Sequence, residues 1–203
     1  MTGYPYRITK RIIDILGGLV GILLFGLLYL LLGPAIKIDS PGPIVVGLPR
    51  ISRGKTITLY KFRSMIAGAH KEKPSLAPLN ERSDGPFFKI ANDPRLTRVG
   101  KYIRKFRIDE VPQFINVLSG EMSLVGPRPH EPAEVQNYPT EFAHLASAKS
   151  GITGLSQVSG ASSLPFRQEL ELDAQYLRNQ SLWLDMKIIA RTAAIMLFDP
   201  SAV

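Results

Sequence analysis

The sequence predicts an α+β fold that is mostly helical, with a small β-hairpin sheet and a re-entrant membrane helix at the N-terminus. Two observations predict it. The 203 residues contain one uncharged apolar run of 22 residues, Ile15 to Ile36, and the remainder mixes helical and strand-like hydrophobic patterns. About 20 apolar residues are enough for a helix to span the hydrocarbon core of a bilayer. We therefore expect a membrane-embedded helix over residues 1–38 and a separate domain over residues 39–203.

Basic residues flank the apolar run on both sides, and this pattern predicts that the helix is re-entrant. Positive charge normally marks the cytoplasmic side of a membrane segment, so both ends are expected on that side. The run is longer than the roughly 7–15 apolar residues of a signal peptide, which favours a retained helix. A buried core helix is the alternative. Gly26 and Pro34 are candidate break points, and Asp14 is expected near the lipid boundary. The flanking cations are Arg7, Lys10 and Arg11 before the run and Lys37, Arg50, Arg53 and Lys55 after it.

A β-hairpin is expected directly after the membrane helix. The β-rich runs 44–46 and 56–62 are separated by the turn sequence Ser52-Arg53-Gly54-Lys55. Residues 68–85 are polar and contain two prolines, and they predict a mobile loop.

Three helices are expected in the second half of the chain. The first carries an apolar stripe at helical spacing. The second begins at Asp109 as an N-cap, with Pro112 in its first turn, and ends at Gly120. The third, residues 181–198, is amphipathic, which is typical both of a helix lying in a bilayer interface and of an ordinary core-packing helix. The stripe of the first helix consists of Val99, Tyr102, Ile103 and Phe106.

The composition restricts the kinds of partner, catalytic site and metal site that the chain can have. The net charge of +8 indicates an anionic partner, which could be nucleic acid, anionic lipid or a phosphorylated substrate. The chain has no cysteine, so disulfides, thiolate catalysis and cysteine metal sites are excluded. The histidines His70, His130 and His144 lack metal-ligand spacing, and a zinc site is not expected.

Two adjacent carboxylates, Asp109 and Glu110, lie close in sequence to Arg104 and Arg107. Carboxylates among arginines at the start of a helix suit phosphoryl transfer through a metal ion. Spacing alone favours an ordinary structural cap, because Asp is among the commonest N-cap residues and Glu favours the first turn.

Several short motifs occur together and in one order along the chain, from Lys10 to about Phe198. With them the sequence resembles the bacterial sugar transferase family, the monotopic phosphoglycosyl transferases, in a form limited to the minimal catalytic unit. The motifs are Lys10-Arg11-Ile12-Ile13-Asp14-Ile15, Asp39-Ser40-Pro41-Gly42-Pro43, Tyr60-Lys61-Phe62-Arg63-Ser64-Met65, Asp109-Glu110-Val111-Pro112-Gln113, Met122-Ser123-Leu124-Val125-Gly126-Pro127-Arg128-Pro129 and Gly151-Ile152-Thr153-Gly154-Leu155.

The resemblance implies an activity. A sugar-1-phosphate would move from a UDP-sugar to polyprenyl (undecaprenyl) phosphate, giving polyprenyl diphosphate sugar and UMP. This would be the first membrane step of bacterial glycan or exopolysaccharide synthesis. Asp109 would be the nucleophile and form a covalent aspartyl-phosphosugar intermediate. Glu110 would assist through the metal or by proton handling, and Asp109 and Glu110 would be the ligands of Mg²⁺. The implied substrate-binding residues are Lys61, Arg63, Arg104, Arg128 and Asp173.

The resemblance also implies a place and partners. Residues 39–203 would form a catalytic domain on the cytoplasmic face of the bacterial inner membrane. The expected partners are the UDP-sugar, polyprenyl phosphate and the bilayer; a homodimer is compatible with the sequence, and nucleic acid is not expected. A membrane-anchored phosphohydrolase and a non-catalytic module that binds anionic lipid or nucleic acid are the alternatives.

Two positions depart from the family pattern. Gly26-Leu27 stands where the family often has a kinking Ser-Pro, and Ala161 stands where it often has Arg after Gln157-Val158-Ser159-Gly160. A contact with the nucleotide or sugar is expected to be lost at Ala161, and Arg167 is a candidate to replace it.

Overall fold

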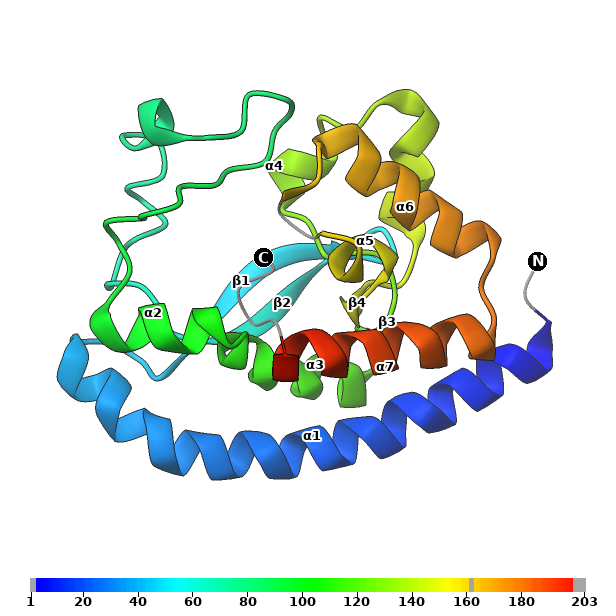
Figure 1. Ribbon diagram of the computed structural model, residues 1–203, viewed down its shortest axis with the longest axis horizontal. Coiled ribbons are helices and arrows are strands. Elements are labelled where there is room, and N and C mark those ends of the chain that lie inside the picture. The colour runs from blue at the N-terminus through cyan, green and yellow to red at the C-terminus, as the bar shows by residue number, and fades with distance from the viewer. Residues whose placement is uncertain (1–2, 161–162, 199–203) are drawn as a thin grey trace.

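The computed structural model describes residues 3–160 and 163–198, and its α+β architecture confirms the prediction. The helices are α1 (Tyr4–Asp39), α2 (Arg98–Lys105), α3 (Phe114–Ser119), α4 (Pro132–Val135), α5 (Leu155–Val158), α6 (Phe166–Arg178) and α7 (Leu182–Phe198), with 3₁₀ helices η1 (Ala77–Leu79), η2 (Ile108–Gln113) and η3 (Thr140–Ser147). The strands are β1 (Val45–Ser52), β2 (Lys55–Phe62), β3 (Ser123–Val125) and β4 (Gly151–Thr153). Helix α1 forms a long curved layer beneath the other elements (Figure 1).

One face of α1 packs closely against the domain. A Cβ at Gly18 would lie 2.6 Å from the Leu118 side chain, and a Cβ at Gly21 would lie 2.1 Å from the Phe114 ring, so only glycine allows α1 and α3 to approach this closely. The opposite face is apolar and exposed. Its stripe consists of Leu16, Val20, Leu23, Leu27 and Leu30. Among the described residues, α1 is the one helix that is long and apolar enough to cross a membrane.

Asp14 is buried, which corrects the expectation that it lies at the lipid boundary. Its carboxylate accepts hydrogen bonds from the Ser123 hydroxyl at 2.8 Å and from the Leu124 N–H at 2.8 Å. Lys149 Nζ lies 3.6 Å from the same carboxylate. A buried carboxylate needs such partners, and they join α1 to the start of β3.

The predicted hairpin is confirmed. Strands β1 and β2 pair antiparallel from Val45↔Phe62 to Ser52↔Lys55. The two turn residues, Arg53 and Gly54, both have positive φ, of 53° and 69°. This is the geometry of the tight turn that matches the twist of a hairpin.

A parallel pair, β3 with β4, was not predicted from the sequence. Each strand has three residues, too few for a period-2 pattern to be recognised. The pair ends at Gly126, whose ideal Cβ would lie 2.6 Å from the Lys149 carbonyl oxygen. Glycine is therefore required where the chain leaves β3 and enters the loop that carries Arg128.

The segment around Asp109 differs from the prediction. Asp109 is not an N-cap: it lies inside the 3₁₀ helix η2, whose N-cap is Arg107. Helix α3 follows directly and ends at Gly120. The φ of Gly120, 85°, confirms the prediction that a glycine ends this helix. The start of α2 is capped by the Thr97 hydroxyl, which accepts the Gly100 N–H at 3.0 Å.

Helix α7 is exposed over much of its surface. Asp185 and Ile188 are its two buried residues among those described, whereas Trp183, Leu197 and Phe198 are 70%, 75% and 85% exposed. Such large exposed apolar side chains are typical of a helix that meets another apolar phase.

Candidate active site

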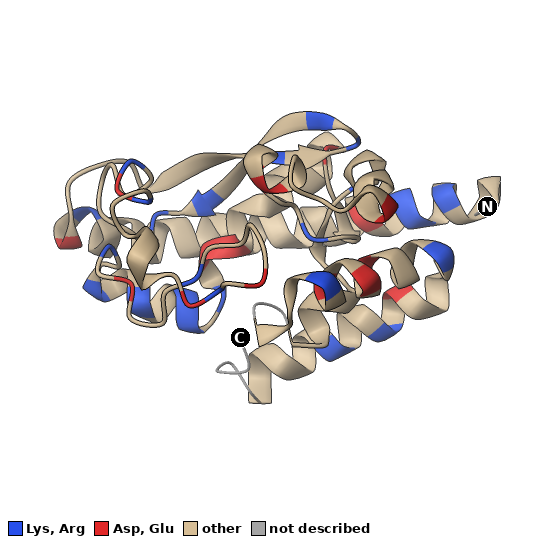
Figure 2. Cartoon of the chain, turned by 90° about the horizontal axis from the view of Figure 1, so that it is seen from above, with Lys and Arg blue, Asp and Glu red and all other residues tan. Residues whose placement is uncertain are grey.

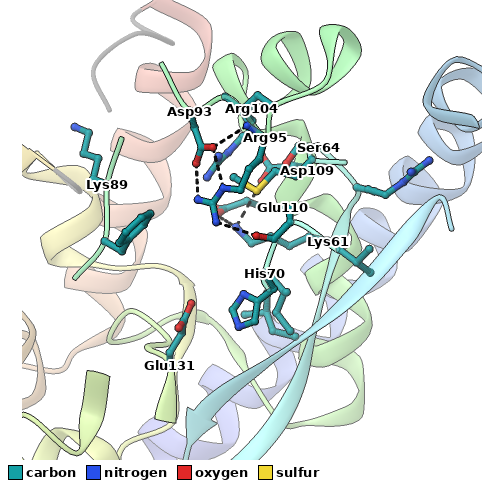
Figure 3. Close-up of a pocket in the computed structure, with 18 of the residues that line it drawn as sticks. Lys61, Ser64, His70, Lys89, Asp93, Arg95, Arg104, Asp109, Glu110 and Glu131 are labelled. Atoms are coloured by element: carbon teal, nitrogen blue, oxygen red, sulfur yellow. Dashed lines mark hydrogen bonds and ion pairs between the residues drawn. The ribbon is translucent and has the colours of Figure 1, made fainter. Parts of the chain in front are cut away.

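A cleft of about 990 Å³ lies between the β1–β2 hairpin, the segment 63–97 and the loop after β3. Lys61 extends from β2 toward Asp109 and Glu110 on η2, as Figure 3 shows. The hairpin packs on η2, so the strand and the 3₁₀ helix present these three side chains to one space. The structure therefore brings together the predicted residues Lys61, Arg104, Asp109, Glu110 and Arg128 along the cleft.

Lys61 bridges the two carboxylates. Its Nζ lies 2.6 Å from Glu110 Oε1 and 3.5 Å from Asp109 Oδ2. Burial raises the pKa of Asp109 above its ordinary value, although Lys61 opposes the rise. Burial acts the same way on Glu110, but Lys61, Arg128 and Arg107 outweigh it and lower the pKa of Glu110. Asp109 is thus a partly desolvated carboxylate, which suits a nucleophile, beside a firmly ionised Glu110.

The arginines stabilise the ionised forms of both carboxylates. Arg104 acts on Asp109, Arg128 acts on Glu110, and Arg107 acts on both. With Lys61 they place four cations around the two carboxylates of the dyad, an arrangement suited to a diphosphate.

Asp173 supports the loop that carries Arg128. It is 1% exposed and does not line the cleft. Its carboxylate accepts the Arg128 backbone N–H at 3.0 Å and the Ser156 hydroxyl at 2.7 Å. Burial raises the pKa of Asp173 to about 6. The geometry therefore makes Asp173 a positioning residue rather than a group that touches substrate.

Arg63 has partners that the sequence did not suggest. Its guanidinium donates to the Ile36 carbonyl at 3.0 Å, the Ser40 carbonyl at 2.7 Å and the Ser40 hydroxyl at 2.8 Å, and also to the Pro41 carbonyl. The side chain is 3% exposed. Arg63 lines the cleft, but its Nη1 and Nη2 donors cap the C-terminus of α1 and are not directed at the other site residues.

Glu169 and His130 were not predicted as site residues. Glu169 is 1% exposed, and its Oε1 lies 3.1 Å from His130 Nε2 and 3.8 Å from Arg128 Nε. The signal in the sequence was the spacing of Glu169 and Asp173, four residues apart and therefore on one face of α6. Both carboxylates meet the Arg128 loop from this face.

Gln157 lines the cleft and donates to the Ile152 carbonyl at 2.9 Å. Ala161, where the family pattern is broken, lies outside the described residues. Arg167, the candidate replacement, pairs instead with Glu141 at 3.0 Å and with Glu171 at 3.3 Å on the surface.

The dyad can contribute to a magnesium site. Within residues 3–160 and 163–198 no three His, Cys, Asp or Glu residues cluster as metal ligands. Magnesium, however, is often held by one or two protein carboxylates together with substrate phosphates and water. Asp109 and Glu110 supply two carboxylates in a cleft that is wide and basic enough to admit phosphates, so the donor set fits this ion.

Comparison with known proteins identifies relatives over almost the whole chain. The family model described as bacterial sugar transferase matches residues 5–199. A protein of Streptococcus agalactiae named galactosyl transferase CpsE is 42% identical over 201 residues, which are 98% of this chain and 44% of the relative. The undecaprenyl-phosphate galactose phosphotransferase of Salmonella typhimurium is 38% identical, over 94% of this chain and 41% of the relative.

A third relative is nearer in length. The UDP-glucose:undecaprenyl-phosphate glucose-1-phosphate transferase of Caulobacter vibrioides is 38% identical over 203 residues, which are 95% of this chain and 71% of the relative. The chain thus spans less than half of the streptococcal and Salmonella proteins and most of the Caulobacter one.

Proposed function

Because this chain belongs to the bacterial sugar transferase family, we propose that it transfers a sugar-1-phosphate from a UDP-sugar to undecaprenyl phosphate. The products are polyprenyl diphosphate sugar and UMP. One observation carries the proposal: a buried carboxylate, Asp109, faces Lys61 at 3.5 Å in a cationic cleft. The printed names of the Salmonella and Caulobacter relatives support the lipid acceptor.

The first step is an attack by Asp109. One of its carboxylate oxygens bonds to the β-phosphorus of the UDP-sugar, and the bond from that phosphorus to the oxygen shared with the α-phosphate breaks. The electron pair leaves with UMP, and the sugar phosphate remains on Asp109 as an acyl phosphate. Lys61 and Arg104 oppose the rise in the pKa of Asp109 that burial causes, and they balance the charge on the transferring group.

The second step restores the enzyme. An oxygen of the lipid phosphate attacks the same phosphorus, and the bond to Asp109 breaks to return the carboxylate. Division into two displacements lets two anionic substrates use the same cations in turn. Asp109 and Glu110 would hold Mg²⁺, which when bound supplies additional neutralisation of phosphate charge.

The domain lies, in this proposal, on the cytoplasmic face of the inner membrane, with α1 re-entrant. Contacts at both ends of α1 support this. Near its N-terminus, Lys10 Nζ meets Asp185 at 2.8 Å, and near its C-terminus, Asp39 accepts the Val99 N–H at 2.8 Å. A helix anchored at both ends to one domain cannot carry those ends to opposite sides of a bilayer. In Figure 2 the blue positions of Lys and Arg gather toward the N-terminal end of α1, and the middle of the helix carries no charged residue.

The two alternatives make different demands on the acceptor. A phosphohydrolase would use the same cleft with water in place of the lipid phosphate. A non-catalytic binding module would give no role to a buried Asp109 beside Glu110 in a cleft lined by cations. The transferase is favoured because the printed names of the Salmonella and Caulobacter relatives give a lipid phosphate, rather than water, as the acceptor.

The test is UMP release from a panel of UDP-sugars by the purified chain in detergent, with and without polyprenyl phosphate. We expect turnover only with the lipid, and one equivalent or less of UMP without it. Mass spectrometry of the protein incubated with UDP-sugar alone should detect a sugar-phosphate adduct on Asp109. Sustained UMP release in the absence of lipid would indicate the phosphohydrolase, and no release from any UDP-sugar would leave a binding module.

A further inference from the structure

Arg107 stands out among the cations of the cleft because two of its donors have no acceptor. Its Nε and Nη2 atoms are buried, and in the described part of the chain neither makes a hydrogen bond. The residue lines the cleft and directly precedes the segment that carries Asp109. Buried guanidinium donors are costly when unpaired, so an arginine in this state calls for an explanation.

The other arginines of the region are paired differently. Arg63 donates to the end of α1 through both of its Nη atoms and leaves one atom, Nε, without a partner, and Arg95 donates to Asp93 at 2.6 Å and 2.9 Å. Arg128 has Glu169 at 3.8 Å. Arg107 lines the same cleft as Arg128 and keeps two buried donors without a partner. Two guanidinium groups that line one cleft can bind a shared anion.

We infer that Arg107, together with Arg128, binds a phosphate group of one of the two substrates. The inference rests on the proposed function, which supplies those phosphates. A phosphate offers several acceptor oxygens, and the planar guanidinium can donate to two of them at once through Nε and Nη2. The anion would pair the orphaned donors and offset the repulsion between the two arginines. Glu110 is the carboxylate of the dyad whose ionised form both arginines stabilise.

The chain offers a variant that removes the guanidinium without disturbing the backbone. Arg107 has φ 54° and ψ 19°, in the left-handed region, which asparagine tolerates better than most residues. Arg107→Asn therefore keeps the local fold and removes the unpaired donors. The thermal unfolding temperature of the free protein should be equal to or above that of the wild type. A structural role for Arg107 would lower it instead. Lys55→Asn, at the exposed hairpin turn, is the control for loss of one positive charge.

Measurements of binding and turnover then show which substrate carries the phosphate that Arg107 binds. UMP and uridine are titrated into each protein by calorimetry, and the exchange of labelled UMP into UDP-sugar is followed without lipid. If the nucleotide phosphate is bound, Arg107→Asn should weaken UMP binding about 10- to 100-fold while uridine binding is unchanged, as expected for lost charged hydrogen bonds. The UMP affinity of Arg107→Lys should lie between those of the wild type and of Arg107→Asn, since lysine keeps the charge but not the planar pair of donors.

If the lipid phosphate is bound instead, UMP binding and exchange should match the wild type while the KM for polyprenyl phosphate rises by a similar factor. UMP binding, exchange and lipid KM all within twofold of the wild type in Arg107→Asn would overturn the inference. A wild-type protein that releases no UMP at all would remove the proposed function and this inference with it, whereas an active wild type with an equally active variant removes the inference alone.

Discussion

At the scale of single residues, the site depends on how burial and nearby cations divide their effects between two adjacent carboxylates. Asp109 is 5% exposed, and burial raises its pKa, whereas the cations around Glu110 lower that of its neighbour. Because the two groups share Lys61, their protons titrate as a pair. The arrangement leaves Asp109 partly desolvated and reactive, and it keeps Glu110 ionised.

Asp109→Asn should abolish turnover and leave the fold intact. The amide has nearly the same shape but cannot form the acyl phosphate, so UMP release should fall by about 10³-fold or more. The unfolding temperature should hold or rise, because a buried charge is removed. UMP release and thermal unfolding, measured on the same preparation, check both statements. Release within tenfold of the wild type would assign the nucleophile elsewhere.

Asp173→Asn should change the pH dependence of stability more than the activity. The folded pKa of Asp173 is raised from 3.8 to about 6, so its contribution to stability is full below pH 3.8 and is lost as the pH rises through 6. Asn does not ionise. The unfolding free energy of the variant relative to the wild type should therefore increase between about pH 4 and pH 7, by up to about 3 kcal/mol.

Urea unfolding at several pH values measures this difference, and comparison with the wild type cancels the titration of other groups. The variant should keep turnover within about tenfold, since Asn can still accept the Arg128 N–H. A constant difference across the pH range would mean that Asp173 is ionised without penalty in the folded protein.

At the scale of elements, the residue that directly follows β2, Arg63, holds the C-terminal end of α1. Arg63, at the end of β2, donates to the last carbonyls of α1 and to the Ser40 hydroxyl, which fixes where the chain leaves α1 and enters the hairpin. The hairpin in turn packs on η2 and sets the position of Lys61 against Asp109. The geometry of the dyad therefore depends on a helix end that lies outside it.

Arg63→Met should destabilise the protein rather than weaken substrate binding. Several buried carbonyls lose a charged donor, which should lower the unfolding free energy by about 3 kcal/mol or more. The KM for UDP-sugar of the folded protein should stay within about twofold. Lys55→Met, at the exposed turn, is the matched control. A tenfold rise in KM with unchanged stability would return Arg63 to the substrate-binding residues, as the family resemblance implied.

At the scale of the whole molecule, polar and apolar surfaces lie on different sides. The outer stripe of α1 and the exposed end of α7 are apolar, whereas the cleft is lined by cations and carboxylates. With the apolar surfaces in the bilayer, as we propose, a lipid phosphate at the interface would reach the cleft. The division of the surface therefore supports the proposed position of the molecule on one side of the membrane.

Cysteine labelling tests whether both ends of α1 lie on the cytoplasmic side of the membrane. Because the chain has no native cysteine, only the introduced cysteine can react. Single cysteines at Tyr4, which is 78% exposed, and at Asn179 on the surface of the domain should both be protected from a membrane-impermeant maleimide in intact cells. Both should react after lysis, which is the control for accessibility. Labelling at Tyr4 with protection at Asn179 would show that α1 spans the bilayer.

Much of the architecture follows from local patterns in the chain. The uncharged run predicted α1, and the two β-rich runs with the Arg-Gly turn between them predicted the hairpin. Gly120 predicted the end of α3. These predictions were possible because hydrophobic periodicity and turn chemistry depend on only a few neighbouring residues. The parallel pair β3–β4 escaped prediction since it joins segments far apart in sequence through only three residues each.

The sequence by itself determined the family, the α+β class, the apolar helix and the residue types of the site. Only the tertiary structure decided which cations face the carboxylates: it directs Arg63 to the end of α1, places Asp173 behind Arg128, and leaves Arg107 with unpaired donors in the cleft. The physical reason is that a charge pattern is read along the chain, whereas burial and hydrogen-bond partners arise from segments that meet only after folding.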